Sequence, residues 1–185
     1  YPNVWTVEKI EAEVHKKELN QVKLLGLREP EFEYTDKTSF LLATSKCVEY
    51  LNYTTDRLSR VPTSIIIAMA GVESGWGTSR FANEGNALFG VRTWDLKNVA
   101  HMKAKGNPDA SWGVKKYKTK CQSVHDMIKI LNRHPAYKEF RIEREKQMDS
   151  GKWNYRTLMV LMNAWSTNPD YHEIILQAIV DNKLP

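Results

Sequence analysis

The sequence predicts a mainly helical α+β domain in which a small β-hairpin lobe forms one wall of a cleft. Apolar residues recur at about 3.6-residue spacing through most of the chain, as in amphipathic helices. Between residues 88 and 117 the pattern changes to short β-branched or aromatic stretches, separated by the turn sequence Gly106-Asn-Pro-Asp109. The chain has 185 residues, 42% of them hydrophobic and 26% charged, which suits one domain with a sizeable core.

The predicted helices begin with a charge-rich amphipathic segment over residues 7–25, which lies on the domain or leads into it. A connecting segment with Pro30 follows over residues 27–34. We therefore expect an N-terminal helical extension, residues 1–35, and a main domain, residues 36–185. Further helices are predicted over residues 36–59, 62–74, 124–132, 136–147, 155–165 and 171–182.

The helix over residues 62–74 carries a single carboxylate near its end. Pro62 opens the helix, Gly75 ends it, and no charge occurs before Glu73. At helical spacing Glu73 lies below Ile66 and Met69, on the buried stripe. Burial raises a carboxyl pKa, as a general acid near neutral pH requires. The alternative is an ordinary glutamate at a helix end with its carboxylate in water.

Two segments carry a resemblance to a known family. The run Glu73-Ser-Gly-Trp-Gly-Thr-Ser-Arg-Phe-Ala and the run Gly85-Asn-Ala-Leu-Phe-Gly90 resemble the signature of the glucosaminidase family of peptidoglycan hydrolases, above all its Bax-type branch. Further matches follow in order within residues 114–126, 131–141 and 165–171, and the similarity spans residues 50–184. The resemblance, which extends to flagellar-type β-N-acetylglucosaminidase domains, implies a lysozyme-like fold and cleavage of β-1,4 glycosidic bonds at N-acetylglucosamine.

The resemblance also implies roles for two residues. Glu73 matches the general acid, and Tyr171 matches the tyrosine that faces it, where a phenol orients the substrate N-acetyl group or stabilises developing charge. Tyr171 can equally start the last helix and pack its ring. Trp76, Phe89 and Trp94 are candidates for the sugar-binding wall, although aromatic residues more often lie in a core.

The remaining candidates lie around the predicted hairpin. Asn86 binds a substrate amide or stabilises its turn, and Tyr117 is a candidate for substrate binding. The commoner family pattern has a glutamate a few residues before the Tyr117-type aromatic, but Gly113 stands about there in this chain. Asp109 is the nearest carboxylate, and its alternative role is in the turn. Without a second carboxylate, substrate-assisted hydrolysis by the N-acetyl group remains open, as does loss of activity.

The two cysteines are too few for a disulfide scaffold and too distant for a CxxC motif, so buried free thiols are one interpretation. Cys121 and His125 would meet on one helix as a thiol-imidazole pair. Ser123, with Asp126 in capping-box position, instead predicts a helix start that leaves Cys121 outside. The five histidines have no metal-ligand spacing, so neither a metal nor a cofactor is expected.

The net charge of +5 favours anionic partners, including nucleic acid and the acidic polymers of a bacterial wall. Basic residues scattered among 22 acids argue against nucleic acid, and the group Lys115, Lys116, Lys118 and Lys120 is interpreted as a solvated strand edge. No apolar run approaches the ~20 residues of a membrane span, and no signal peptide is recognised at the N-terminus.

We expect a monomer that binds peptidoglycan glycan strands in the cell envelope, periplasmic or secreted, with association to a virion as an alternative. Two other functions stay open. A lytic transglycosylase shares the lone Glu-Ser pair at a helix end, although the sequence Asn86-Ala-Leu-Phe-Gly stands where those enzymes have a Gly-Leu-Met-Gln-like segment. A wall-binding or assembly module keeps the cleft without turnover.

Overall fold

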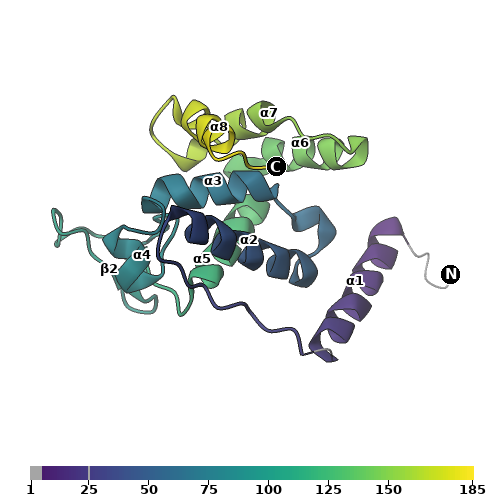
Figure 1. The fold of residues 1–185 in the computed structure, drawn as a ribbon, viewed down its shortest axis with the longest axis horizontal. Helices are drawn as coiled ribbons and strands as arrows, with labels where there is room; N and C mark the ends of the chain where they lie inside the picture. Colours follow the sequence, from purple (N-terminus) through teal and green to yellow (C-terminus); the bar gives the residue numbers. More distant parts are fainter. Residues whose placement is uncertain (1–5, 25) are drawn as a thin grey trace.

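The computed structural model describes residues 6–24 and 26–185, which form helices around one core and a small β lobe (Figure 1). The helices of these residues are α1 (Val7–Leu24), α2 (Lys37–Thr54), η1 (Arg57–Ser59), α3 (Thr63–Ser74), α4 (Arg80–Gly85), α5 (Lys120–Arg133), η2 (Pro135–Tyr137), α6 (Lys138–Ser150), α7 (Tyr155–Val160), η3 (Asn163–Trp165) and α8 (Tyr171–Asp181). The strands are β1 (Arg92–Thr93), β2 (His101–Met102) and β3 (Gly113–Lys115).

Helix α3 lies in the middle of the helical body and contacts α2 on one side and α8 on the other (Figure 1). Nearly all of its side chains are buried, which the absence of charge before Glu73 permits on every face. The predicted bounds of this helix differ from the observed ones by one residue. Because the helix packs against its neighbours on all sides, the position of Glu73 in its last turn is fixed.

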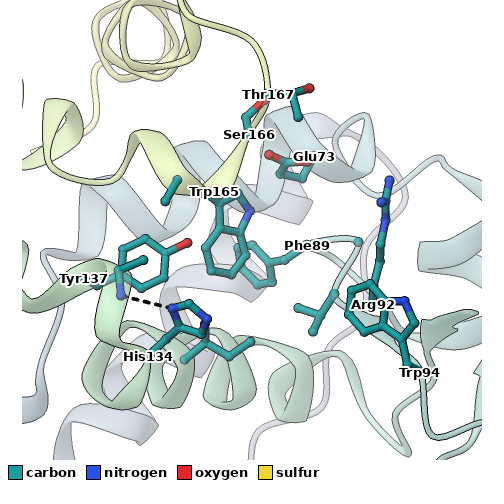
Figure 2. Close-up of a pocket in the computed structure, with 14 residues that line it drawn as sticks. Glu73, Phe89, Arg92, Trp94, His134, Tyr137, Trp165, Ser166 and Thr167 are labelled. Atoms are coloured by element: carbon teal, nitrogen blue, oxygen red, sulfur yellow. Dashed lines mark hydrogen bonds between the residues drawn. The ribbon is translucent and has the colours of Figure 1, made fainter. Parts of the chain in front are cut away.

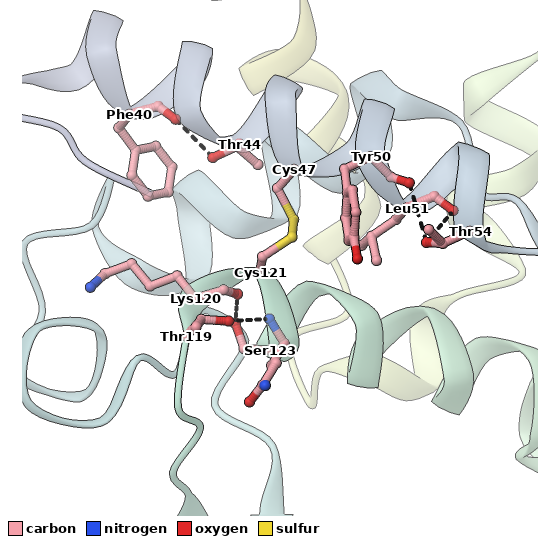
Figure 3. The surroundings of a disulfide bond; sticks show 11 residues. Phe40, Thr44, Cys47, Tyr50, Leu51, Thr54, Thr119, Lys120, Cys121 and Ser123 are labelled. Atoms are coloured by element: carbon pink, nitrogen blue, oxygen red, sulfur yellow. Dashed lines mark hydrogen bonds between the residues drawn. A yellow bond between two sulfur atoms is a disulfide. The ribbon is translucent and has the colours of Figure 1, made fainter. Parts of the chain in front are cut away.

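A disulfide bond joins Cys47 of α2 to Cys121 of α5, with 5.6 Å between their Cα atoms (Figure 3). Both cysteines are fully buried in the core. The interpretation as free thiols is therefore wrong, and so is the alternative of a nucleophilic Cys121. Helix α5 starts before Ser123 because Thr119 caps it, accepting the backbone N–H of Gln122 at 3.1 Å. This places Cys121 inside the helix.

The β lobe is a three-stranded antiparallel sheet with the order β1-β3-β2. Strands β2 and β3 form the predicted hairpin, and β1 adds to the other edge of β3, with Arg92 opposite Val114. The interpretation of the nearby lysines as a solvated strand edge is wrong for two of them. Lys115 pairs with Asp126 at 3.0 Å, and Lys120 belongs to α5.

The remaining differences lie at short elements and at the N-terminal side. The predicted helix over residues 36–59 is divided into α2 and η1, that over residues 155–165 into α7 and η3, and α4 was not predicted because its six residues are too few for a periodic pattern. The predicted connecting segment packs on the core: Phe32 and Tyr34 contact each other and Phe40 edge to face.

Helix α1 contacts α2 and is joined to the body by an extended segment (Figure 1). Its side chains Val7, Ile10 and Val14 are exposed. Residue 25, at the predicted end of this helix, lies outside the described residues. Within residues 6–24 and 26–185 no helix has both the length and the apolar character that crossing a membrane requires. The division of the chain at residue 35 stays a prediction.

Candidate active site

A cleft of about 550 Å³ lies between the helical body and the β lobe (Figure 2). One wall comes from the last turn of α3, the end of α5, and the segments around η2 and η3. The other comes from the segment that leads into and out of β1. The lining residues are Glu73, Phe89, Gly90, Val91, Arg92, Trp94, Ile130, His134, Ala136, Tyr137, Ala164, Trp165, Ser166 and Thr167.

Glu73 reaches this cleft because α3 ends one residue later, at Ser74. Gly75 adopts the left-handed conformation with φ of 60°, and its N–H bonds the Gly71 carbonyl. The Ser74 hydroxyl fixes the same turn, since it donates to the Ala70 carbonyl at 2.5 Å and accepts the Gly77 N–H at 2.8 Å. The last turn of α3 therefore presents Glu73 beside Ser166 and Thr167 (Figure 2).

The Glu73 side chain is exposed, so its predicted place on the buried stripe is wrong. The side chains of the earlier turns of α3 are buried, whereas its last turn lies at the cleft. The predicted direction of its pKa is nevertheless confirmed: desolvation raises it, and the interaction with Tyr171 lowers it by less. Both the exposure of the side chain and its raised pKa are explained if the carboxyl is open on the cleft side and surrounded by protein on its other sides.

Tyr171, the first residue of α8, lies beside Glu73 with only 3% of its surface exposed. Burial raises the pKa of its phenol, and the negative charge of Glu73 raises it further. Among the described residues its buried hydroxyl has no hydrogen bond of normal geometry. A buried donor without a partner is rare in folded proteins, and this one interacts with the carboxyl of the cleft.

Aromatic rings form the floor of the cleft (Figure 2). Phe89, 3% exposed, meets Trp165 edge to face at 6.3 Å between ring centroids, and Trp165 lies 6.2 Å from Tyr137. Trp94 of the lobe is 65% exposed. Phe89 and Trp94 were predicted at this wall. Trp165, Tyr137 and His134 were not, although the motif segments that signal the family contain all three.

The structure does not bring Trp76 into the cleft. Trp76 has φ of +55°, which turns its ring back onto Gly71, where a Cβ atom would lie 2.3 Å from the ring. Lys37 covers the ring at 4.1 Å from its centroid. The ring lines a separate groove between the start of α2, α3 and α8.

Asn86 and Tyr117 also lie outside the lining of the cleft. The Asn86 amide donates to the carbonyls of Tyr117 and Lys118, both at 3.1 Å, so it stabilises the turn. The Tyr117 hydroxyl donates to Asp126 at 2.8 Å. Asp126 is thus no helix cap, because its carboxylate joins the lobe to α5.

The hairpin supplies no carboxylate to the cleft. Asp109 is exposed in the loop between β2 and β3 and does not line it. At Gly113 a Cβ atom would lie 2.6 Å from the ring of His101, which is held with Nδ1 2.8 Å from the Val99 carbonyl oxygen. A glutamate at Gly113 would therefore need His101 to move. The described residues include no group of three His, Cys, Asp or Glu side chains suited to a metal ion.

Comparisons with known proteins agree with this architecture. The chain resembles the catalytic domain of the autolysin Auto from Listeria monocytogenes, with a TM-score of 0.57, 18% identity, and coverage of 98% of this chain and 97% of that one. This likeness confirms the predicted mainly helical, lysozyme-like fold with a small β lobe.

At the level of sequence, the chain is 30% identical over 132 residues to the protein Bax of Escherichia coli K12. That match covers 69% of this chain and 45% of Bax, so the chain spans about half the length of that relative. The glucosaminidase family model, described as mannosyl-glycoprotein endo-beta-N-acetylglucosaminidase, matches residues 53–184. As the resemblance predicted, the chain belongs to the glucosaminidase family.

Proposed function

We propose that this protein is a peptidoglycan hydrolase that cleaves β-1,4 glycosidic bonds at N-acetylglucosamine, with Glu73 as the general acid. One observation carries the proposal: a carboxyl whose pKa is raised by desolvation opens into a cleft lined by aromatic rings. Family membership and the likeness to an autolysin domain support the same class of substrate.

The chemistry follows from the leaving group. A sugar alkoxide leaves poorly unless its oxygen is protonated, so the acid must keep its proton at the working pH. Desolvation of Glu73 favours the protonated form. Once the proton has been transferred, Tyr171 stabilises the carboxylate, as its lowering effect on the pKa of Glu73 indicates. Tyr171 is buried and acts through Glu73, so we assign it a positioning role.

The second group of the reaction comes from the substrate in this proposal. Glycosidases that use two carboxylates hold them about 5–10 Å apart across the scissile bond. Within the described part of the chain, Glu73 is the single Asp or Glu that lines the cleft. The N-acetyl group of the sugar can attack the anomeric carbon itself, which requires only one acid from the protein.

The presence of one carboxylate among the described residues that line the cleft also favours a second candidate, a lytic transglycosylase, since that reaction also needs one acid. A cleft that binds the wall without turnover is the third outcome of the test below. In each case the protein would act outside the cytoplasm. The buried disulfide between α2 and α5 supports this, because such bonds form and persist in oxidising compartments.

The test is digestion of purified peptidoglycan, with mass analysis of the fragments, by the wild type and by Glu73→Gln. We expect new reducing N-acetylglucosamine ends from the wild type and a loss of at least about 100-fold in the variant, the usual size of a general acid's contribution. Glu49→Gln is the matched control, because Glu49 is an exposed carboxylate on α2, outside the cleft.

Each other result has a defined meaning. Anhydro-muramic ends would identify the transglycosylase, and binding of glycan without fragments would identify the non-catalytic module. Equal rates for the wild type and Glu73→Gln would contradict the role of Glu73.

A further inference from the structure

The cleft contains one cationic side chain that the proposed reaction does not use. Among the described lining residues Arg92 is the single Lys or Arg, and it extends from β1 along the lobe wall (Figure 2). The nearby His134 imidazole uses its Nδ1 as the acceptor for the Ala136 N–H, at 3.2 Å. The charge of Arg92 therefore stands alone on its side of the cleft.

Arg92 is positioned by an aromatic ring and not by an acid. Its guanidinium carbon lies 4.0 Å from the centroid of Trp112, an arrangement that holds the planar group by a cation–π interaction. No ion pair between Arg92 and a described carboxylate is observed. A guanidinium stacked in this way keeps its N–H edges free, and those edges match the two oxygens of a carboxylate.

The proton donor does not account for this arginine either. The pKa of Glu73 is shifted by desolvation and by Tyr171, whereas a nearby unpaired cation would lower it. Glu73 comes from the last turn of α3 and Arg92 from β1, so the two charged groups line the cleft from different walls. N-acetylglucosamine is neutral and needs no cation, but the muramic acid that alternates with it carries a lactyl carboxylate, either free or extended by a peptide that bears carboxylates of its own.

We propose that Arg92, stacked on Trp112, forms a carboxylate-binding subsite in the cleft, which recognises a carboxylate carried by the glycan strand. This inference rests on the proposed function for the identity of the strand. It deepens that function by separating muramic-acid glycans from neutral polymers of N-acetylglucosamine. Because Arg92 is exposed, we expect an effect of moderate size.

Binding measurements test the subsite independently of turnover. In a Glu73→Gln background, affinities are measured for peptide-free glycan strands, for the same strands with their lactyl carboxylates converted to amides, and for strands that retain their peptides. Arg92→Gln should weaken binding of the carboxylate-bearing strands by about tenfold and leave binding of the amidated strands unchanged. Arg92→Lys should recover only part of the loss, because lysine lacks the planar fork.

The matched control is Lys97→Gln, which removes an exposed positive charge from the segment between β1 and β2, outside the cleft lining. A loss confined to peptide-free strands identifies the lactyl carboxylate, and a loss confined to strands with peptides identifies a peptide carboxylate. Equal effects of Arg92→Gln on amidated and free strands, or no measurable binding by the parent protein, overturn the subsite.

The two proposals fail separately. If the wild type releases reducing N-acetylglucosamine ends and Arg92→Gln still binds every strand normally, the hydrolase stands and the subsite falls. If no fragments form but binding depends on both Arg92 and the carboxylate, the subsite stands and hydrolysis falls.

Discussion

The two walls of the cleft are built in different ways. The helical wall carries Glu73 on a helix whose side chains are nearly all buried, and a disulfide joins two of the surrounding helices. The lobe wall consists of strands of two or three residues and presents Arg92 and Trp94 with their side chains exposed. Under the proposed function this difference would divide the work, with the packed body holding the acid and the lobe contacting the substrate.

Removal of the disulfide should give the largest effect on the helical wall. The bond links cysteines 74 residues apart, and loop-closure entropy predicts that the Cys47→Ala/Cys121→Ala variant loses about 4 kcal/mol of unfolding free energy. Urea denaturation measures this loss. The wild type after reduction should lose a similar amount. Unchanged midpoints for both would mean that packing alone maintains the helical wall.

Trp94→Ala should affect recognition and leave the fold intact. The ring is 65% exposed, so its removal costs the core nothing, but a sugar ring stacked on it would lose about 1–1.5 kcal/mol. We expect KM for glycan strands to rise about tenfold at unchanged kcat and unchanged thermal stability. Trp153→Ala removes an exposed tryptophan between α6 and α7, outside the cleft lining, and should have no effect on KM. A fall in stability for Trp94→Ala would contradict the division between the walls.

Tyr171→Phe should give the smallest effect, a shift in the pH profile. In the proposed reaction the acid form of Glu73 is the active one, so kcat/KM should fall as pH rises through the pKa of Glu73. Tyr171 lowers that pKa, and without its hydroxyl the pKa rises. The alkaline limb of the profile therefore moves to higher pH.

The control for this shift is Tyr155→Phe, whose hydroxyl donates to the Pro185 carbonyl at 2.7 Å, away from the cleft lining. It should leave the profile unchanged. Movement of the limb to lower pH in Tyr171→Phe would show that Tyr171 does not act on Glu73 in this way.

Sequence reasoning succeeded where the signal is local. Helix α3 was predicted to within one residue because Pro62, an apolar run without charge before Glu73, and Gly75 mark its bounds without tertiary information. The start of α5 was missed although Thr119 and Gln122 form a capping-box pattern, since Ser123 offered a competing one. Local patterns thus predict the helices but leave their ends open.

The candidate site was predictable only in part, because the direction in which a side chain points depends on the tertiary structure. Trp76 and Trp165 both occur in the family motifs, yet the left-handed backbone at Trp76 turns its ring away from the cleft, while Trp165 lines it. The pairing of Cys47 with Cys121 likewise depends on how α2 packs against α5. Neither outcome can be read from spacing along the chain.

The disulfide has a consequence for where a functional fragment can be cut. Cys47 lies before residue 53, where the match to the family begins, whereas Cys121 lies within it. A fragment trimmed to residues 53–184 would leave Cys121 with a free thiol and would remove Phe40 and Val48 from the core. The segment that matches the family is therefore shorter than the segment that forms the folded core. Truncated versions of this protein should retain the whole of α2.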